Sequence, residues 1–75
     1  MQLTVHVDKA YSGSAIARIY MPGCEMVLVM PEGVMTRAQG FDIEMQKKII
    51  RALRPYRDTM AEKAINHNYE IEIEI

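Results

Sequence analysis

The clearest indication of the fold is Tyr69-Glu70-Ile71-Glu72-Ile73-Glu74-Ile75, because charged and apolar residues alternate there without a break. This period of two predicts a β-strand with one buried face and one face in water. The isoleucines are expected to pack against a helical layer. The glutamates are expected to stay solvated and to discourage pairing with another chain. They are not expected to bind a cation, since cation sites usually draw their ligands from several elements rather than from one strand.

The residues before this strand have the period of a helix. From Asp42 onward, apolar residues recur within about one third of the circumference, and they are Met45, Ile49, Ala52, Leu53, Tyr56, Met60 and Ala64. Asp42 is the predicted N-cap. Pro55 cannot donate a hydrogen bond and crowds the preceding turn, so the helix should kink there or split in two. The kink is favoured, because the apolar stripe stays in phase across Pro55.

The first half of the chain is predicted to form three strands. Residues 3–8 alternate between apolar and polar, residues 15–21 place Ile16, Arg18 and Tyr20 on one side, and residues 25–30 are nearly all apolar. Residues 34–40 have no clear period and are predicted to be a connection. The sequence therefore predicts one α+β domain over residues 1–75: a three-stranded antiparallel meander, one long Pro-kinked helix on one sheet face, and a fourth strand (βββαβ).

Composition excludes several classes of protein. The chain of 75 residues has a formal charge of -1 and 49% hydrophobic residues, unlike a disordered segment. Its single cysteine, Cys24, cannot form an internal disulfide, and no zinc spacing, phosphate loop or nucleophile motif is present, so no cofactor is expected. The amino-terminal residues predict neither a signal peptide nor a membrane span. We expect a cytoplasmic protein without membrane contact. A small, compact, single-domain chain of this kind is typical of bacterial or phage gene products.

A basic run on the predicted helix is the first candidate for binding. It comprises Lys47, Lys48, Arg51, Arg54 and Arg57. Such cations grip phosphates or an acidic partner surface, and they are also typical of a solvated helix face, where Glu44–Lys48 and Arg54–Asp58 have the i,i+4 spacing that stabilises helices. The solvated face is the favoured interpretation, because acidic residues are interleaved and few aromatic residues are available to stack on bases.

Methionines are the second candidate. Four of them surround the third predicted strand, at positions Met21, Met26, Met30 and Met35. Methionine fills irregular cores and also lines adaptable contact surfaces. Core packing is the favoured interpretation, and an apolar interface with a partner is the alternative.

A local motif and the element order suggest a family resemblance. The residues Ile19-Tyr20-Met21-Pro22-Gly23-Cys24 are similar to the strand and Pro-Gly-Cys turn of the amino-terminal domain of HicB-type antitoxins, which has a truncated ribonuclease H-like fold. The resemblance implies a protein that binds and blocks a small ribonuclease toxin. Enzymes of the larger ribonuclease H family hold two metal ions with acidic residues. The resemblance to that family implies Asp8, Glu44 and Glu74 as the matching ligands in this chain.

These observations rank three functions. The first is a non-enzymatic regulatory protein, antitoxin-like or inhibitor-like, that docks on another protein and forms a homodimer, since a core this small is marginal alone. The second is a nucleic-acid-binding regulator that uses the basic run against phosphates. The third is a minimal Mg²⁺-dependent nuclease using Asp8, Glu44 and Glu74.

Overall fold

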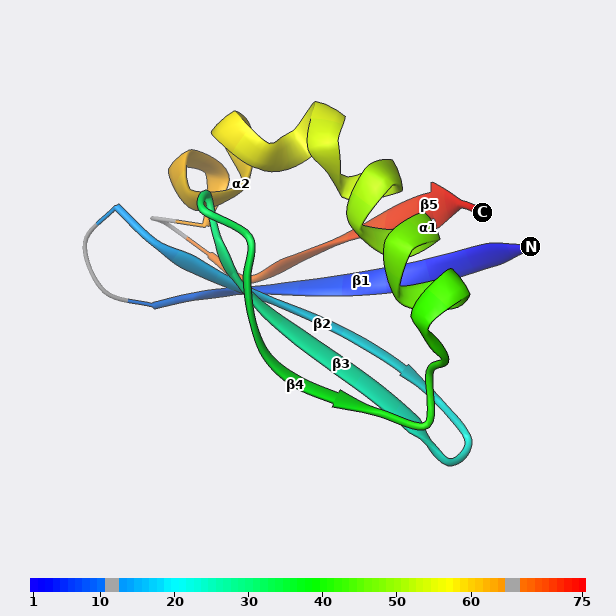
Figure 1. Cartoon of the computed structure of the whole chain (residues 1–75). Helices are drawn as coiled ribbons and strands as arrows, with labels where there is room; N and C mark the ends of the chain where they lie inside the picture. The colour runs from blue at the N-terminus through cyan, green and yellow to red at the C-terminus, as the bar shows by residue number, and fades with distance from the viewer. Residues whose placement is uncertain (11–12, 65–66) are drawn as a thin grey trace.

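The computed structural model, which describes residues 1–10, 13–64 and 67–75, is a single antiparallel sheet covered on one face by a helical segment (Figure 1). The strands are β1 (Gln2–Lys9), β2 (Ala15–Met21), β3 (Cys24–Met30), β4 (Val34–Gln39) and β5 (Tyr69–Glu74). The helical segment consists of α1 (Ile43–Leu53), a 3₁₀ turn (Arg54–Tyr56) and α2 (Arg57–Lys63). The α+β class, the antiparallel meander and the single helical layer are as the sequence predicts.

The number of strands differs from the prediction. Residues 34–40 are not a mere connection, because β4 pairs with β3 and forms one edge of a five-stranded sheet of order β4-β3-β2-β1-β5. All six residues of β4 are exposed, so no buried face marks the strand in the sequence. A register shift between Val27 and Leu28 further disturbs the alternation. Hydropathy patterns indicate burial, and this strand is held by backbone pairing and by polar side-chain contacts to β3, such as the Arg37–Glu25 ion pair.

The helical segment begins as predicted. The Asp42 carboxylate accepts a hydrogen bond from the Met45 backbone N–H at 2.8 Å, which makes Asp42 the N-cap of α1. Around Pro55 the helical path continues as a 3₁₀ turn that separates α1 from α2. Tyr56 was expected on the buried stripe but is 37% exposed. A 3₁₀ turn has about 3.0 residues per turn, so it rotates Tyr56 away from the sheet.

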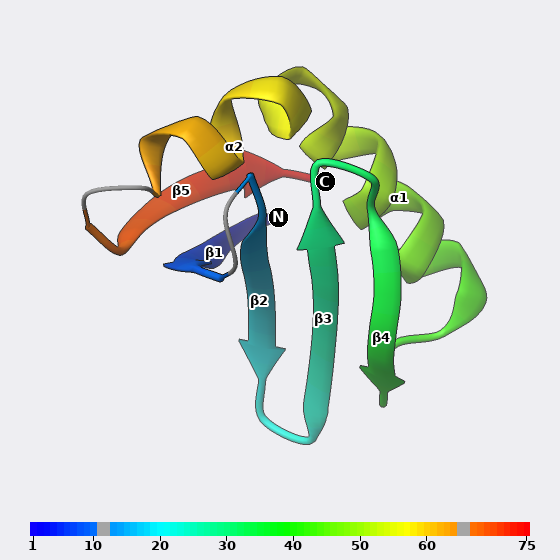
Figure 2. The ribbon, with the colours of Figure 1, turned by 90° about the vertical axis from the view of Figure 1, so that its left-hand side faces the viewer.

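The core lies between the helical segment and one sheet face. Its largest fully buried side chains are Ile19, Met26, Leu28, Ile49, Met60, Val5 and Val7. Of the β5 isoleucines, Ile73 is buried, whereas Ile71 and Ile75 are half-buried against the core. The strand order places β4 and β5 at opposite edges of the sheet. The helical segment runs across the sheet from the β4 edge to the β5 edge (Figures 1 and 2).

Candidate functional site

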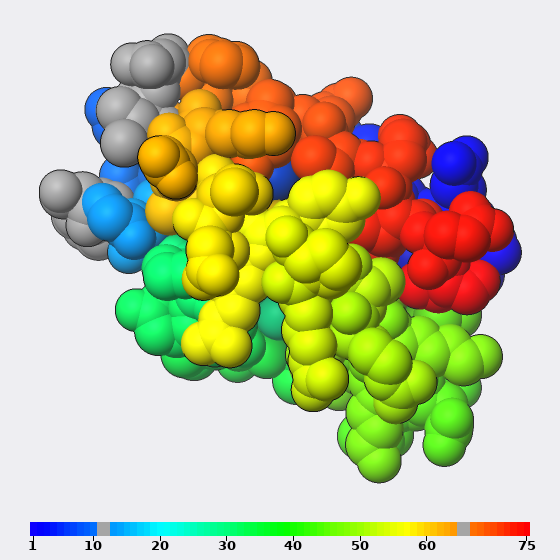
Figure 3. Space-filling model, turned by 90° about the horizontal axis from the view of Figure 1, so that it is seen from above, coloured from blue at the N-terminus to red at the C-terminus, as the bar shows by residue number. Residues whose placement is uncertain are grey.

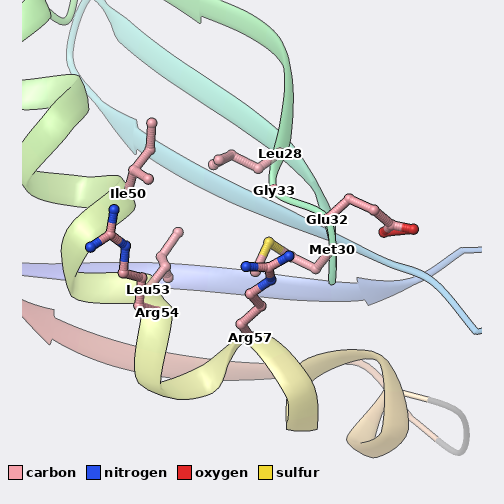
Figure 4. A pocket seen from close by; sticks show the side chains of 8 residues that line it. All are labelled: Leu28, Met30, Glu32, Gly33, Ile50, Leu53, Arg54 and Arg57. Carbon is pink, nitrogen blue, oxygen red and sulfur yellow. The ribbon is translucent and has the colours of Figure 1, made fainter.

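A pocket of about 170 Å³ lies between the helical segment and the turn that joins β3 to β4. We call it the helix–hairpin pocket, and it is lined by Leu28, Met30, Glu32, Gly33, Ile50, Leu53, Arg54 and Arg57. Figure 4 shows the helical side chains and the hairpin side chains on its two sides, and Figure 2 shows the hairpin turn close to the helical segment.

The pocket has an apolar floor and a charged mouth. Leu28, Met30 and Leu53 are buried, whereas Arg54 and Arg57 are exposed on the helical side of the mouth. Glu32 is exposed on the hairpin side. A floor without polar groups cannot bind a ligand's hydrogen-bonding atoms, so the pocket suits an apolar group whose charged neighbours remain at the mouth.

Local backbone geometry builds both walls. Gly33 has a φ of 79°, and its N–H donates to the Val29 carbonyl at 2.8 Å, which closes the hairpin turn. On the opposite wall, Arg54 and Arg57 are three residues apart across the 3₁₀ turn. Residues at i and i+3 of a 3₁₀ turn lie in line along the helix axis, so the turn at Pro55 directs both arginines toward the same side.

Arg57 also ties the two walls together. Its Nε donates to the Pro31 carbonyl oxygen at 2.6 Å, from the first residue of α2 to the hairpin. This bond occupies one of five guanidinium N–H donors, so the rest of the group stays available to a ligand. Arg54 makes no ion pair with Glu32 or with any other carboxylate in the described part of the chain.

The size of the pocket limits what it can hold. An apolar cavity of about 150 Å³ accepts a benzene ring, and clefts that hold drug-sized ligands measure about 300–1,000 Å³. The helix–hairpin pocket, at about 170 Å³, therefore fits roughly one leucine, methionine or phenylalanine side chain. It is too small for a nucleotide or a typical organic cofactor.

The basic run does not form one site. Arg54 and Arg57 border the helix–hairpin pocket, whereas Lys48 and Arg51 line a separate hollow with Glu74 and Ile75 on the β5 side. Figure 3 shows the helical segment lying between the hairpin turn (green) and β5 (red). All five cations, including Lys47, are exposed, and no described carboxylate lies within 4.0 Å of their nitrogens. The expected Glu44–Lys48 and Arg54–Asp58 pairs are not among the ion pairs of residues 1–10, 13–64 and 67–75.

Charge is divided between the two layers. Residues 43–63 contain six cationic and three acidic side chains, a formal charge of +3. The rest of the chain contains three cationic and seven acidic side chains, a charge of -4. The total of -1 therefore hides a positive helical layer over a negative sheet. Such a surface attracts acidic groups to the helical side at short range, within about 10 Å at ordinary salt.

The methionines are mainly part of the core. Met26 and Met30 are 0% and 3% exposed and point toward the helical layer, and Met30 also forms part of the pocket floor. Met21 is half-buried beside the start of the helical segment, and Met35 is 40% exposed on the edge strand. The four residues thus do not present a common outer surface.

The acidic residues implied by the ribonuclease H resemblance are not brought together. Asp8 lies opposite Ile16 near one end of β1, and Glu74 pairs with Gln2 at the other end. Gln2 and Asp8 are six residue steps apart on β1, which is about 20 Å at the rise of a strand. No group of three metal-ligating side chains occurs in the described ranges. Because β5 runs antiparallel to β1, its last residues lie beside the first residues of β1, far from Asp8.

The sheet face away from the helical segment has its own pattern. Each β5 glutamate contacts β1 or the amino terminus: Glu70 lies 2.9 Å from His6 Nδ1, Glu72 accepts from the Thr4 hydroxyl at 2.8 Å, and Glu74 lies 3.5 Å from the Met1 amino group. These contacts hold the three β5 glutamates against β1 and the amino terminus, whereas the sequence predicted only that the glutamates are solvated.

Apolar residues form a row on three adjacent strands of the same face. Ile16 pairs with Val29, and Val29 pairs with Val34. Ion pairs flank this row, with Arg18 3.9 Å from Asp8 and Arg37 bound to Glu25. The charges on the central strands are therefore compensated within the chain.

Sequence reasoning missed half of the pocket. Glu32 and Gly33 lie between the predicted third strand and the predicted connection and were given no role, although they form the hairpin wall. Ile50 gave the available signal, since it is an apolar helical residue outside the predicted core stripe and next to Arg51. An apolar residue off the stripe indicates a second contact, here with the pocket.

Comparisons with protein-family models, curated proteins and solved structures found no match. Within the described residues, no helix has the length and apolar character needed to cross a membrane.

Proposed function

We propose that this chain is a non-enzymatic regulatory protein of the cytoplasm that docks on another protein through the helix–hairpin pocket. The observation that carries the proposal is an apolar floor sized for one side chain beneath two exposed arginines. A buried apolar anchor ringed by polar contacts is the arrangement that contributes most of the binding energy in protein interfaces. The partner's activity is inhibited on docking, which is the role implied by the resemblance of residues 19–24 to antitoxins.

The alternative is a nucleic-acid-binding regulator that uses the same basic run. Five exposed cations without described acidic partners favour it. The floor of the pocket argues for protein instead, because single-stranded nucleic acid is held by aromatic side chains stacked on bases, and the pocket is lined by none. The cations are also spread over both sides of the helical segment rather than along one groove.

Affinity purification from lysate of the native host tests the proposal. The tagged chain is incubated with nuclease-treated and untreated lysate, and everything retained is identified. We expect a stoichiometric protein that survives nuclease treatment. Nucleic acid that is lost with nuclease or with raised salt, and that is weakened by Arg51→Glu or Arg54→Glu, would establish the alternative.

A matched pair of variants links retention to the pocket. Ile50→Phe enlarges a side chain that lines the pocket, whereas Ile43→Phe makes the same change at a 63% exposed position in the first turn of α1. We expect Ile50→Phe to abolish retention and Ile43→Phe to preserve it. Equal retention by both variants, or no protein retained by the unaltered chain, contradicts the proposal.

The proposal includes a homodimer that pairs the open sheet faces of two copies. Its support is the apolar row Ile16, Val29 and Val34, whose flanking charges are compensated within each copy. The ion pairs beside the row leave the charges next to it compensated, whereas two helical layers of charge +3 repel each other. Light scattering tests this: we expect a dimer that Val29→Lys dissociates and Ile43→Lys leaves intact, and a strict monomer at high concentration excludes it.

A further inference from the structure

We infer that the partner segment carries one apolar anchor residue with carboxylates beside it, and that these carboxylates lie over the helical segment rather than over the hairpin. This inference rests on the proposed function and specifies the chemistry of the partner. The apolar side chain enters the helix–hairpin pocket, and the flanking acidic residues contact Arg54 and Arg57 at its mouth.

The charges around the mouth support an acidic segment. Arg54 and Arg57 are both exposed, and neither has a carboxylate within 4.0 Å among the described residues. The helical layer as a whole carries a formal charge of +3, which adds to the attraction of acidic groups toward this mouth. A guanidinium that has not been neutralised within its own chain is available for bidentate pairing with a partner carboxylate. A basic segment would meet the same groups as like charges.

The two sides of the mouth differ, and this difference sets the orientation of the segment. Glu32 borders the pocket on the hairpin side, opposite the arginines, as Figure 4 shows. A carboxylate in the partner on that side would face Glu32, which is unfavourable. The acidic residues therefore lie on the helical side of the anchor, and neutral or basic residues lie on the hairpin side.

Met30 provides a direct reporter of the pocket. Its thioether lies in the pocket lining, whereas Met26 is 0% exposed in the core and Met21 lines a separate hollow at the start of α1. Methyl-labelled methionine in the full chain therefore gives one signal for the pocket and two internal controls in a single NMR spectrum. The probe is a short peptide with a leucine between two runs of aspartate, so that one run lies over the arginines and the other is deliberately opposed by Glu32. Its matched controls replace the aspartates with asparagine, or the leucine with alanine.

We expect the acidic leucine peptide to move the Met30 signal and leave the Met26 and Met21 signals in place. Arg54→Glu should weaken binding about tenfold, and Arg54→Gln about threefold, since each exposed charge contact contributes little alone. Glu32→Gln should strengthen binding of this peptide about two- to fivefold by removing the opposing carboxylate. Lys9→Glu reverses an exposed cation that does not line the pocket, and it should have little effect.

Each other result overturns a defined part. Equal binding of the asparagine peptide overturns the acidic partner and leaves the docking pocket intact. Equal binding of the alanine peptide overturns the apolar anchor. A larger shift of the Met30 signal with an oligothymidine strand than with the peptide would mean that the partner is a nucleic acid rather than a protein. No movement of Met30 by the acidic peptide overturns the inference. The proposed function still stands in that case if a protein from lysate is retained by the unaltered chain and lost with Ile50→Phe.

Discussion

Arg57, at the start of α2, is fastened to the β3–β4 hairpin by a hydrogen bond from its Nε to the carbonyl oxygen of Pro31, 26 positions earlier in the chain, at 2.6 Å. The bond joins the two walls of the helix–hairpin pocket. Arg57 therefore has a structural role in joining the two walls. Arg54 also borders the pocket but, in the described part of the chain, makes no such bond to the hairpin.

Replacing Arg57 should lower stability more than replacing Arg54. We expect Arg57→Gln to reduce the free energy of unfolding by about 1 kcal/mol, because it removes an exposed hydrogen bond with a charged donor. Arg54→Gln removes the same charge without that bond, and it should change stability by less than about 0.5 kcal/mol. Urea unfolding of both variants measures the difference. Equal losses would mean that the Pro31 contact contributes nothing to stability.

Gly40 should tolerate no side chain. It has a φ of 83°, and a Cβ atom there would overlap the Gly23 carbonyl oxygen and lie 2.9 Å from the Cα of Cys24. Gly33 has a similar φ of 79° but open space around it. Gly33→Ala should cost about 1–2 kcal/mol through backbone strain alone. Gly40→Ala should cost about 1–3 kcal/mol more through overpacking, as thermal unfolding will show; similar losses would argue against close packing at Gly40.

Tyr69 should make the protein sensitive to alkali. Burial raises the pKa of the Tyr69 phenol above its ordinary value of 10.0, and its hydroxyl donates to the Met60 carbonyl oxygen at 3.3 Å. Because the folded-state pKa is the higher one, this stabilisation is complete below about pH 10 and is lost as the pH rises through the folded-state pKa. Unfolding measured across this range should show the loss. Tyr69→Phe should remove the Tyr69 part of that dependence, and an unchanged pH profile would contradict the assignment.

The Asp42 cap should contribute measurably to the helical layer. Its carboxylate accepts from Met45 N–H at 2.8 Å. Asp42→Ala should reduce the free energy of unfolding by about 1 kcal/mol, whereas Asp42→Asn keeps an accepting oxygen and should cost less. Chemical denaturation compares the two. If both variants lose the same amount, the negative charge rather than the hydrogen bond carries the effect.

Most of the secondary structure was predictable where burial alternates with the period of an element. The buried stripe Ile49, Leu53 and Met60 marked the helical segment, and the alternation through Ile73 marked β5. The strand β4 was missed because all of its residues are exposed, so its pairing with β3 leaves no trace in hydropathy. The position of Tyr56 was wrong because the helix period changes at the 3₁₀ turn.

The candidate site was predictable only in part. The sequence analysis named Arg54 and Arg57 as members of the basic run, and it assigned Met30 either to the core or to an apolar interface. Nothing local indicated that these three residues line one pocket with Glu32, because they come from β3, the hairpin turn and the helical segment. Their meeting depends on the path of the helical segment across the sheet.

The α+β class, the meander, the helix with its Asp42 cap and the exposed positive face could all be predicted, because each follows from periodicity or chemistry within a few neighbouring residues. Three features arise only in the folded chain: the distance between Asp8 and Glu74, the place of β4 at the sheet edge, and the apolar pocket bordered by two arginines. These features depend on strand order, strand direction and helix crossing. They are set by how distant segments bury their apolar faces together, and no local pattern encodes that choice.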